Sequence, residues 1–323
     1  MHRHEVLIAG AVDEWEIAAG LEAQGVTDGA ARRLRHRDVF GLAEELYARV
    51  PRAGRTAEAA EGPRERAALP PRTVALHLAP GAVCAVAAGA AGTVRLPLVG
   101  ALLAVLVAVA TWAALRSGPL RAARGGGAAV WTYGLLAYAL CGPQAVTALR
   151  GDGSFDATAG TAAFTALTLS LLPAAYCARW LAVSSRAQLA PSHGLSDFAD
   201  AVRPRLIVAL TVYATALFVL LRTAAAVAGP SPVAAPFTLG LLLCTARLLA
   251  VHGYAARAVA GLATACAVES LTLAAALLHL GPGGAAATAV ACAACAAAAL
   301  ALAAQALHVL PRASAHRLPP RRN

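Results

Sequence analysis

Long apolar runs, each close to the thickness of a lipid bilayer, dominate the chain after Arg72. A transmembrane helix needs about 20 mostly apolar residues. We count eight runs near this length, at 73–93, 96–115, 128–149, 161–183, 206–228, 233–252, 258–280 and 285–310. The first run is the weakest because Ala and Gly dominate it, so seven spans is the alternative count. The pattern predicts an all-α fold, a polytopic transmembrane helix bundle over residues 73–310.

The first 50 residues show a different pattern, in which apolar side chains recur at helical spacing among charged ones. Gly25 is predicted to end the first helix, Asp28 to begin the second and Asp38 to open the third. No apolar stretch follows the start of the chain, so we expect no secretory signal. Residues 1–50 are predicted to form a small cytosolic helical head. Residues 51–72, rich in Pro, Arg, Glu and Ala, are predicted to form a linker.

Composition supports the bilayer as the surrounding solvent. Hydrophobic residues make up 59% of the chain and charged residues 14%, whereas soluble domains carry about a quarter charged residues. All 27 basic residues are Arg, and those after Arg72 are concentrated in alternate loops and in the basic tail at 311–323. This bias predicts that both termini lie in the cytoplasm. We expect these arginines to bind the anionic headgroups of the bilayer.

The net charge of +10 also raises nucleic acid as a partner, and its distribution argues against it. Residues 1–72 hold 11 Arg and 12 Asp or Glu, so a head containing the cluster Arg32, Arg33, Arg35 and Arg37 is nearly neutral overall. Binding of nucleic acid draws most of its affinity from neutralising phosphates. We therefore expect no nucleic acid, and the head presents either a solvated helix face or a docking surface for a cytosolic protein partner.

Three ionisable side chains lie deep within the predicted spans, where a charge is costly and marks a functional candidate. Glu269 lies near the middle of the seventh span, and Arg222 and Arg247 lie on either side of the midpoints of the fifth and sixth. At about 1.5 Å per residue, each Arg is displaced from Glu269 by roughly 6–8 Å along the membrane normal. We expect an Arg222–Glu269 or Arg247–Glu269 pair in a polar cavity among spans 5 to 7. The alternative is that both arginines extend to opposite interfaces and that Glu269 is protonated or bonded to Ser270 or Thr272.

Four further polar side chains are weaker candidates. Gln144 follows a Pro in the third span, and Arg179 adjoins a Trp near the inner end of the fourth, where it fits an interface anchor. His252 and His279 lie at span ends, where a His is more often an interface residue than a proton relay.

The sequence predicts neither a metal site nor a cofactor site. Cys292 and Cys295 form a C-x-x-C, but it lies in a nearly unbroken Ala run that offers no polar support for metal or redox chemistry. The motifs of nucleotide-binding loops, zinc proteases and serine hydrolases are absent from the sequence, and this lack of a catalytic cluster makes a membrane-embedded enzyme the third of the functions considered, after a transporter and a scaffold.

The segments from Gly25 to Asp28 and from Asp38 to Tyr47 resemble the head of uncharacterised multi-span membrane proteins of high-GC Gram-positive bacteria. The resemblance implies a bacterial inner-membrane protein associated with the cell envelope and linked to surface polysaccharide. From the intramembrane charges and the basic inner surface, we expect transport of an amphipathic or anionic envelope precursor. The alternative is a membrane scaffold or regulator whose head recruits an envelope-biosynthesis enzyme.

Overall fold

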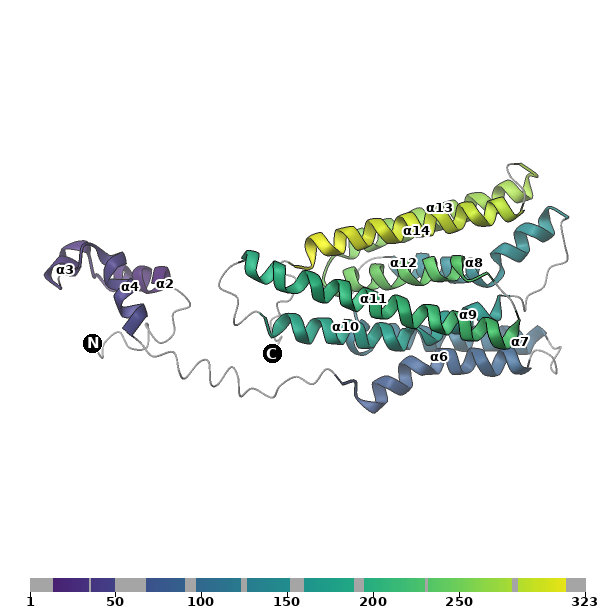
Figure 1. The fold of residues 1–323 in the computed structure, drawn as a ribbon, viewed down its shortest axis with the longest axis horizontal. Coiled ribbons are helices and arrows are strands. Elements are labelled where there is room, and N and C mark those ends of the chain that lie inside the picture. Colours follow the sequence, from purple (N-terminus) through teal and green to yellow (C-terminus); the bar gives the residue numbers. More distant parts are fainter. Residues whose placement is uncertain are drawn as a thin grey trace. The chain divides into compact units, whose positions relative to one another are not determined.

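The computed structural model describes residues 14–34, 36–49, 68–90, 97–122, 127–151, 160–188, 195–229, 232–280 and 284–311. Within these residues every regular element is a helix (Figure 1). The chain separates into two compact units, Met1–Glu65 and Arg66–Asn323. Their boundary falls within the linker predicted at 51–72, of which residues 51–67 lie outside the described residues, as do residues 312–323 of the basic tail.

The first unit packs three short helices, α2 (Glu14–Ala23), α3 (Asp28–Arg33) and α4 (Val39–Arg49). Its core consists of small and branched apolar side chains from all three helices, namely Ile17, Ala18, Leu21, Ala31, Val39, Leu42 and Ala43. The predicted small helical head is therefore confirmed.

The turn after α2 forms where the sequence predicts a helix stop. Gly25 has φ +84°, a left-handed conformation that costs glycine little. The N–H of Gly25 donates to the Glu22 carbonyl at 2.9 Å, and the N–H of Val26 donates to the Leu21 carbonyl at 2.9 Å. These two bonds close the helix end in the Schellman pattern.

Asp38 caps α4 and gives the head a dependence on pH. Its Oδ1 accepts the Gly41 N–H at 2.8 Å, and this bond, together with the Arg37 guanidinium, holds the pKa of the carboxyl below its ordinary value. A lowered pKa stabilises the folded head above about pH 4, and the stabilisation is lost as pH falls through the folded-state pKa. We expect hydrogen exchange of the α4 amides, corrected for intrinsic rates, to accelerate on acidification.

Two substitutions at this position separate the cap from its charge. Asp38→Asn keeps a capping oxygen and should remove the acid-induced change, whereas Asp38→Ala should accelerate exchange at every pH. An acid response that survives in Asp38→Asn would show that another group controls it.

The second unit is the predicted helix bundle. Its helices occupy the eight apolar runs, with the fourth run divided in two. They are α6 (Pro71–Ala90), α7 (Pro97–Leu115), α8 (Ala128–Leu149), α9 (Thr161–Leu169), α10 (Leu171–Arg186), α11 (Leu195–Ala228), α12 (Ala234–Val251), α13 (Ala255–Leu277) and α14 (Gly284–Val309), with a short 3₁₀ turn, η2 (Gly118–Leu120), after α7.

Six stretches of helix in the described residues are long and apolar enough to cross a membrane: Pro71–Gly89, Thr161–Arg186, Ala199–Ala228, Ala234–Val251, Ala255–Leu277 and Ala285–Val309. The first predicted run, the weakest in the sequence, is among them. The second contributes a shorter apolar stretch, Val99–Leu115. The third, α8, has the length, but its Tyr, Trp, Pro and Gln residues lower its hydropathy.

The longest helix of the bundle, α11, contains a proline. It begins at Leu195 and runs on through Pro204. Proline supplies no N–H to the preceding turn, which is tolerated when a side chain bonds a nearby carbonyl. The Arg205 side chain donates to the Ala201 carbonyl in that turn.

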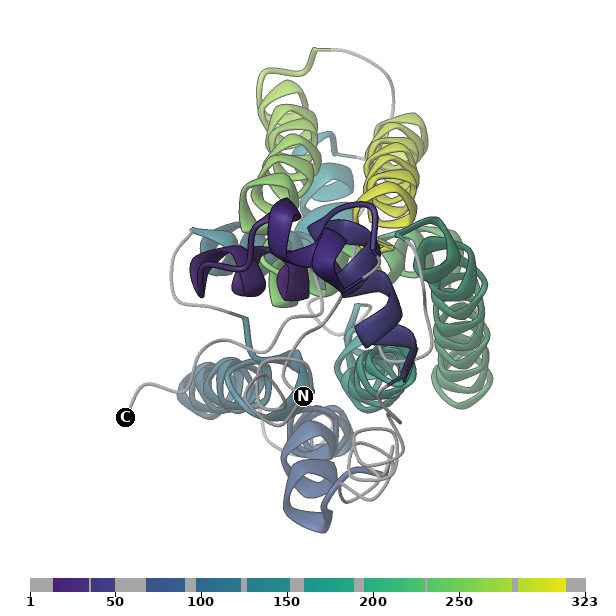
Figure 2. The ribbon, with the colours of Figure 1, turned by 90° about the vertical axis from the view of Figure 1, so that its left-hand side faces the viewer.

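Close helix contacts in the bundle depend on glycine. A Cβ on Gly81 of α6 would overlap the Leu169 side chain of α9, and a Cβ on Gly261 of α13 would lie 2.7 Å from Leu302 of α14. Small residues at helix interfaces let the helices approach closely, which is a common means of packing helices in lipid. Figure 2, which looks along the bundle, shows α11 and α13 on different sides of it.

Candidate functional site

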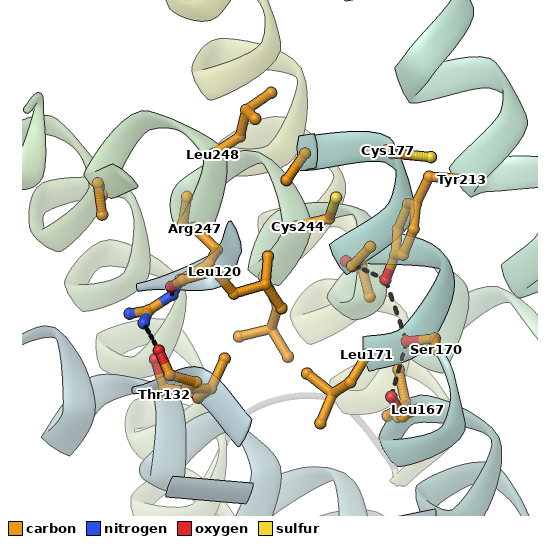
Figure 3. Close-up of a pocket in the computed structure, with 18 of the residues that line it drawn as sticks. Leu120, Thr132, Leu167, Ser170, Leu171, Cys177, Tyr213, Cys244, Arg247 and Leu248 are labelled. Atoms are coloured by element: carbon orange, nitrogen blue, oxygen red, sulfur yellow. Dashed lines mark hydrogen bonds between the residues drawn. The ribbon is translucent and has the colours of Figure 1, made fainter. Parts of the chain in front are cut away.

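A cavity of about 90 Å³ lies inside the bundle, where α7 to α13 meet. Leu, Ala and Cys side chains form most of its wall. Polar groups enter it mainly from two directions: the Arg247 guanidinium lies on one side, and the Tyr213 and Ser170 hydroxyls lie on the other (Figure 3). The wall has the composition of small-molecule sites, which are largely apolar with a few placed polar groups.

The hydroxyl side of the cavity is built at a break in the fourth predicted span. Ser170 lies between α9 and α10, and its Oγ is 2.7 Å from the Leu167 carbonyl oxygen and 3.2 Å from the Tyr213 hydroxyl. The Tyr213 hydroxyl donates to the Gly240 carbonyl at 3.1 Å. Both hydroxyl protons are directed at carbonyls, so neither is left for the contact between the two oxygens. Each hydroxyl oxygen therefore keeps acceptor lone pairs for an N–H or O–H donor of a polar ligand.

Arg247 holds together the other end of the cavity. Its Nε donates to the Leu120 carbonyl of η2 at 2.7 Å, and its Nη2 donates to the Leu115 carbonyl at the end of α7. The last carbonyls of a helix have no partner within it, and a cation there is favourable. These two bonds satisfy such carbonyls and leave other guanidinium N–H groups at the cavity wall.

Glu269 lies outside this cavity. It faces α14 from α13 and is only 4% exposed. Its Oε1 accepts the Cys295 S–H at 3.6 Å, and its buried Oε2 has no hydrogen-bond partner among the residues that the structure describes. The Thr272 hydroxyl one turn further along donates to the Glu269 carbonyl at 2.7 Å, and Tyr138 of α8 contacts that same hydroxyl at 3.2 Å.

The structure does not bring Arg222, Arg247 and Glu269 together, so the predicted ion pairs are wrong. Measured from the turn that joins α12 to α13, Arg247 lies four residues into one helix and Glu269 fourteen residues into the other. At 1.5 Å per residue this is an axial separation of about 15 Å, and Arg247 points toward the carbonyls at its own end. Arg222 is exposed on α11, which packs against α9, α10 and α12.

Gln144 connects two helices of the bundle. With its amide oriented to satisfy both neighbours, its oxygen accepts the Gly160 N–H at 3.2 Å and its nitrogen donates to the Cys141 carbonyl at 3.3 Å. Gly160 is the N-cap of α9, where the first N–H groups lack partners within the helix. Gln144 therefore supplies an acceptor to the start of α9.

The remaining weaker candidates occupy helix ends or helix surfaces. His252 follows α12, and its Nδ1 is 2.8 Å from the Leu248 carbonyl oxygen. His279 follows α13 with φ +53°, and the N–H groups of His279 and Leu280 close the helix end on Ala276 and Ala275. Both histidines have helix-ending roles in the structure. Arg179 is half-buried on α10.

The cysteines are all free thiols. Cys295 of the C-x-x-C pair contacts Glu269, and Cys292 lies 3.7 Å from the Thr238 hydroxyl. Across the described ranges, no group of three or more His, Cys, Asp or Glu side chains is placed to hold a metal ion.

Comparison with protein-family models, with curated proteins and with solved structures finds no match. The class of the protein follows from its own helices, six of which have the length and hydropathy to cross a membrane. The chain is a polytopic membrane protein. The residues predicted from the sequence do not include Ser170 and Tyr213, although a Ser and a Tyr in apolar runs are visible signals in the sequence.

Proposed function

We propose that the protein moves an amphipathic or anionic cell-envelope precursor across the bacterial inner membrane through the central cavity. The observation that carries this proposal is the cavity itself, whose apolar wall suits a lipid chain and whose Arg247 suits an anionic headgroup. Anions such as phosphates form stronger bonds to a guanidinium than neutral carbonyls do.

The contacts of Arg247 suggest how a ligand opens the cavity. An anionic headgroup that binds Arg247 competes with the Leu115 and Leu120 carbonyls, which in this conformation hold η2 to α12. Release of these bonds frees the η2 turn that follows α7. Gly118 in this turn has φ +61°, a left-handed conformation that glycine adopts at little cost. In this mechanism, ligand binding and opening of one end of the cavity are a single exchange of hydrogen-bond partners.

The test is translocation of a fluorescent phosphatidylglycerol in proteoliposomes, followed by quenching of the outer-leaflet probe, with phosphatidylcholine as the uncharged comparison. Ala209 of α11 lines the cavity, so Ala209→Leu should reduce the rate toward that of empty liposomes. Ala226→Leu, on the exposed face of the same helix, should keep the wild-type rate. Equal rates for the wild-type protein and empty liposomes would refute translocation of this class of lipid.

We also propose an eight-span topology with both termini in the cytoplasm. It is supported by the concentration of Arg in alternate loops and by aromatic side chains beneath two of these arginines: Arg116 lies 4.6 Å from the Trp112 ring centre and Arg257 lies 5.4 Å from that of Tyr254. A membrane-impermeant thiol reagent added to intact cells should label Asp152→Cys and leave Arg317→Cys unlabelled until the cells are opened. Equal labelling of both variants would contradict the topology.

A second candidate function, a scaffold that recruits an envelope enzyme, is favoured by the surface of the head. Trp15 is 65% exposed, and its ring centre lies 5.3 Å from that of Phe40, which is also exposed. Large apolar side chains at the surface of a small unit are typical of docking sites. Deletion of residues 1–67 separates the two functions, because a transporter should keep its translocation rate and a scaffold should lose its cellular role.

A further inference from the structure

Glu269 is an acidic side chain held inside the bundle by partners that do not neutralise it. It lies near the middle of α13 and is 4% exposed. One carboxyl oxygen accepts a weak S–H donor from Cys295 at 3.6 Å, and the other oxygen is buried and has no partner within the described part of the chain. An ionised carboxylate in such surroundings is strongly disfavoured unless a cation or several donors compensate it.

The groups packed around Glu269 offer no such compensation. From α14 comes the Cys295 thiol, and from α13 itself comes the Cys266 thiol. From α8 comes Tyr138, whose hydroxyl contacts Thr272. The remaining neighbouring helix, α12, carries Cys244 and Arg247, and both of these line the central cavity instead.

We propose that Glu269 is a proton-binding site: in this conformation the carboxyl is neutral, with the proton on Oε2, and it releases that proton to water when the surrounding helices separate. The step is a simple dissociation of the O–H bond that leaves a carboxylate and a hydrated proton, and it needs no other reactant. The class of ligand is the proton itself.

Two helices, α8 and α13, connect this site to the central cavity. Helix α8, which carries Tyr138, contributes Thr132 and Leu136 to the cavity wall. Helix α13, which carries Glu269, contributes Ala258 and Leu262. Between the two sites the helices are in close contact, since a Cβ on Gly134 of α8 would lie 3.1 Å from the Cys266 sulfur. Ionisation of Glu269 requires water or donors, and admitting them displaces α13 from α8 or from α14. Because α13 contributes Ala258 and Leu262 to the cavity wall, its displacement on proton release changes that wall. This coupling rests on the proposed transport function.

The protonated state is tested first, in the full-length protein in lipid nanodiscs and without any transport substrate. The infrared spectrum should contain the C=O stretching band of a protonated carboxylic acid at neutral pH. That band should be lost in Glu269→Gln and should disappear from the wild-type spectrum as pH rises. Its absence from the wild-type spectrum at neutral and mildly acidic pH would overturn the proposal.

Chemical labelling gives a second readout. Dicyclohexylcarbodiimide enters membranes and reacts with neutral carboxyl groups: the acid O–H adds across one C=N bond, and acyl transfer gives a stable N-acylurea. Intact mass and peptide mapping should locate one adduct on Glu269 at neutral pH, with labelling lost at alkaline pH and in Glu269→Gln. Labelling that does not change with pH would contradict proton binding.

The coupling is tested by applying a pH gradient to the proteoliposomes described above. The gradient should change the rate of phosphatidylglycerol translocation by the wild-type protein and should not change the rate of Glu269→Gln. A wild-type rate that ignores the gradient would overturn the coupling. An infrared band without translocation in any variant would refute the proposed function and leave the proton site standing, so the two failures are distinguishable.

Discussion

Arg247→Ala is expected to be among the most destabilising substitutions in the bundle. The change removes the donors to the Leu120 and Leu115 carbonyls and so leaves the end of α7 and the η2 turn without their cross-link to α12. A buried carbonyl left without a partner costs about 1–3 kcal/mol. The loss of two such bonds should lower the free energy of unfolding by about 2–5 kcal/mol. Thermal or denaturant-induced unfolding of the purified protein in one detergent measures this loss.

Arg222→Ala is the matched control, because it removes the same kind of side chain from an exposed position on α11. Its effect should stay within about 0.5 kcal/mol of zero. Arg247→Lys should recover only part of the wild-type stability, since a Lys ammonium cannot reproduce the fixed fork of donors. Equal losses in Arg247→Ala and Arg222→Ala would contradict the structural role given to Arg247.

Gly160→Ala is expected to cost about 3 kcal/mol, although it adds a single methyl group. Gly160 adopts ordinary right-handed dihedral angles, so backbone strain is not the cause. A Cβ at this position would overlap the carbonyl oxygen of Leu140 on α8, and a backbone atom cannot move aside as the end of a side chain can. The methyl group would also separate the Gly160 N–H from Gln144. Unfolding measurements under the conditions used for Arg247 give the loss.

Gly100→Ala provides the opposite expectation within the same bundle. Gly100 lies inside α7, and a Cβ there meets open space. Alanine is favoured over glycine in a helix interior, so this variant should gain about 0.5–1 kcal/mol. A loss in Gly100→Ala as large as that in Gly160→Ala would show that the close approach of α8 and α9 is not what requires glycine.

Local patterns explain why much of the fold is predictable. Eight apolar runs lie on the bundle helices because burial in lipid depends on the composition of each segment alone. The helix ends at Gly25 and Asp38 are equally local, since each needs only its own residue type and the next few N–H groups. The break at Ser170 and the continuity of α11 through Pro204 are less visible, because contacts with neighbouring residues decide both.

The candidate site shows where prediction from sequence ends. The sequence alone places Arg222, Arg247 and Glu269 within apolar helices, and with the distribution of Arg it determines the class of the protein and favours one orientation. Which helices are neighbours, and which way each side chain points, depends on contacts between segments far apart in the chain. The tertiary structure alone therefore assigns Arg247 to the carbonyls of Leu115 and Leu120 and gives Glu269 a thiol as its partner. The physical reason is that hydropathy assigns a residue to a membrane span, whereas a hydrogen bond also requires the right neighbour at the same depth.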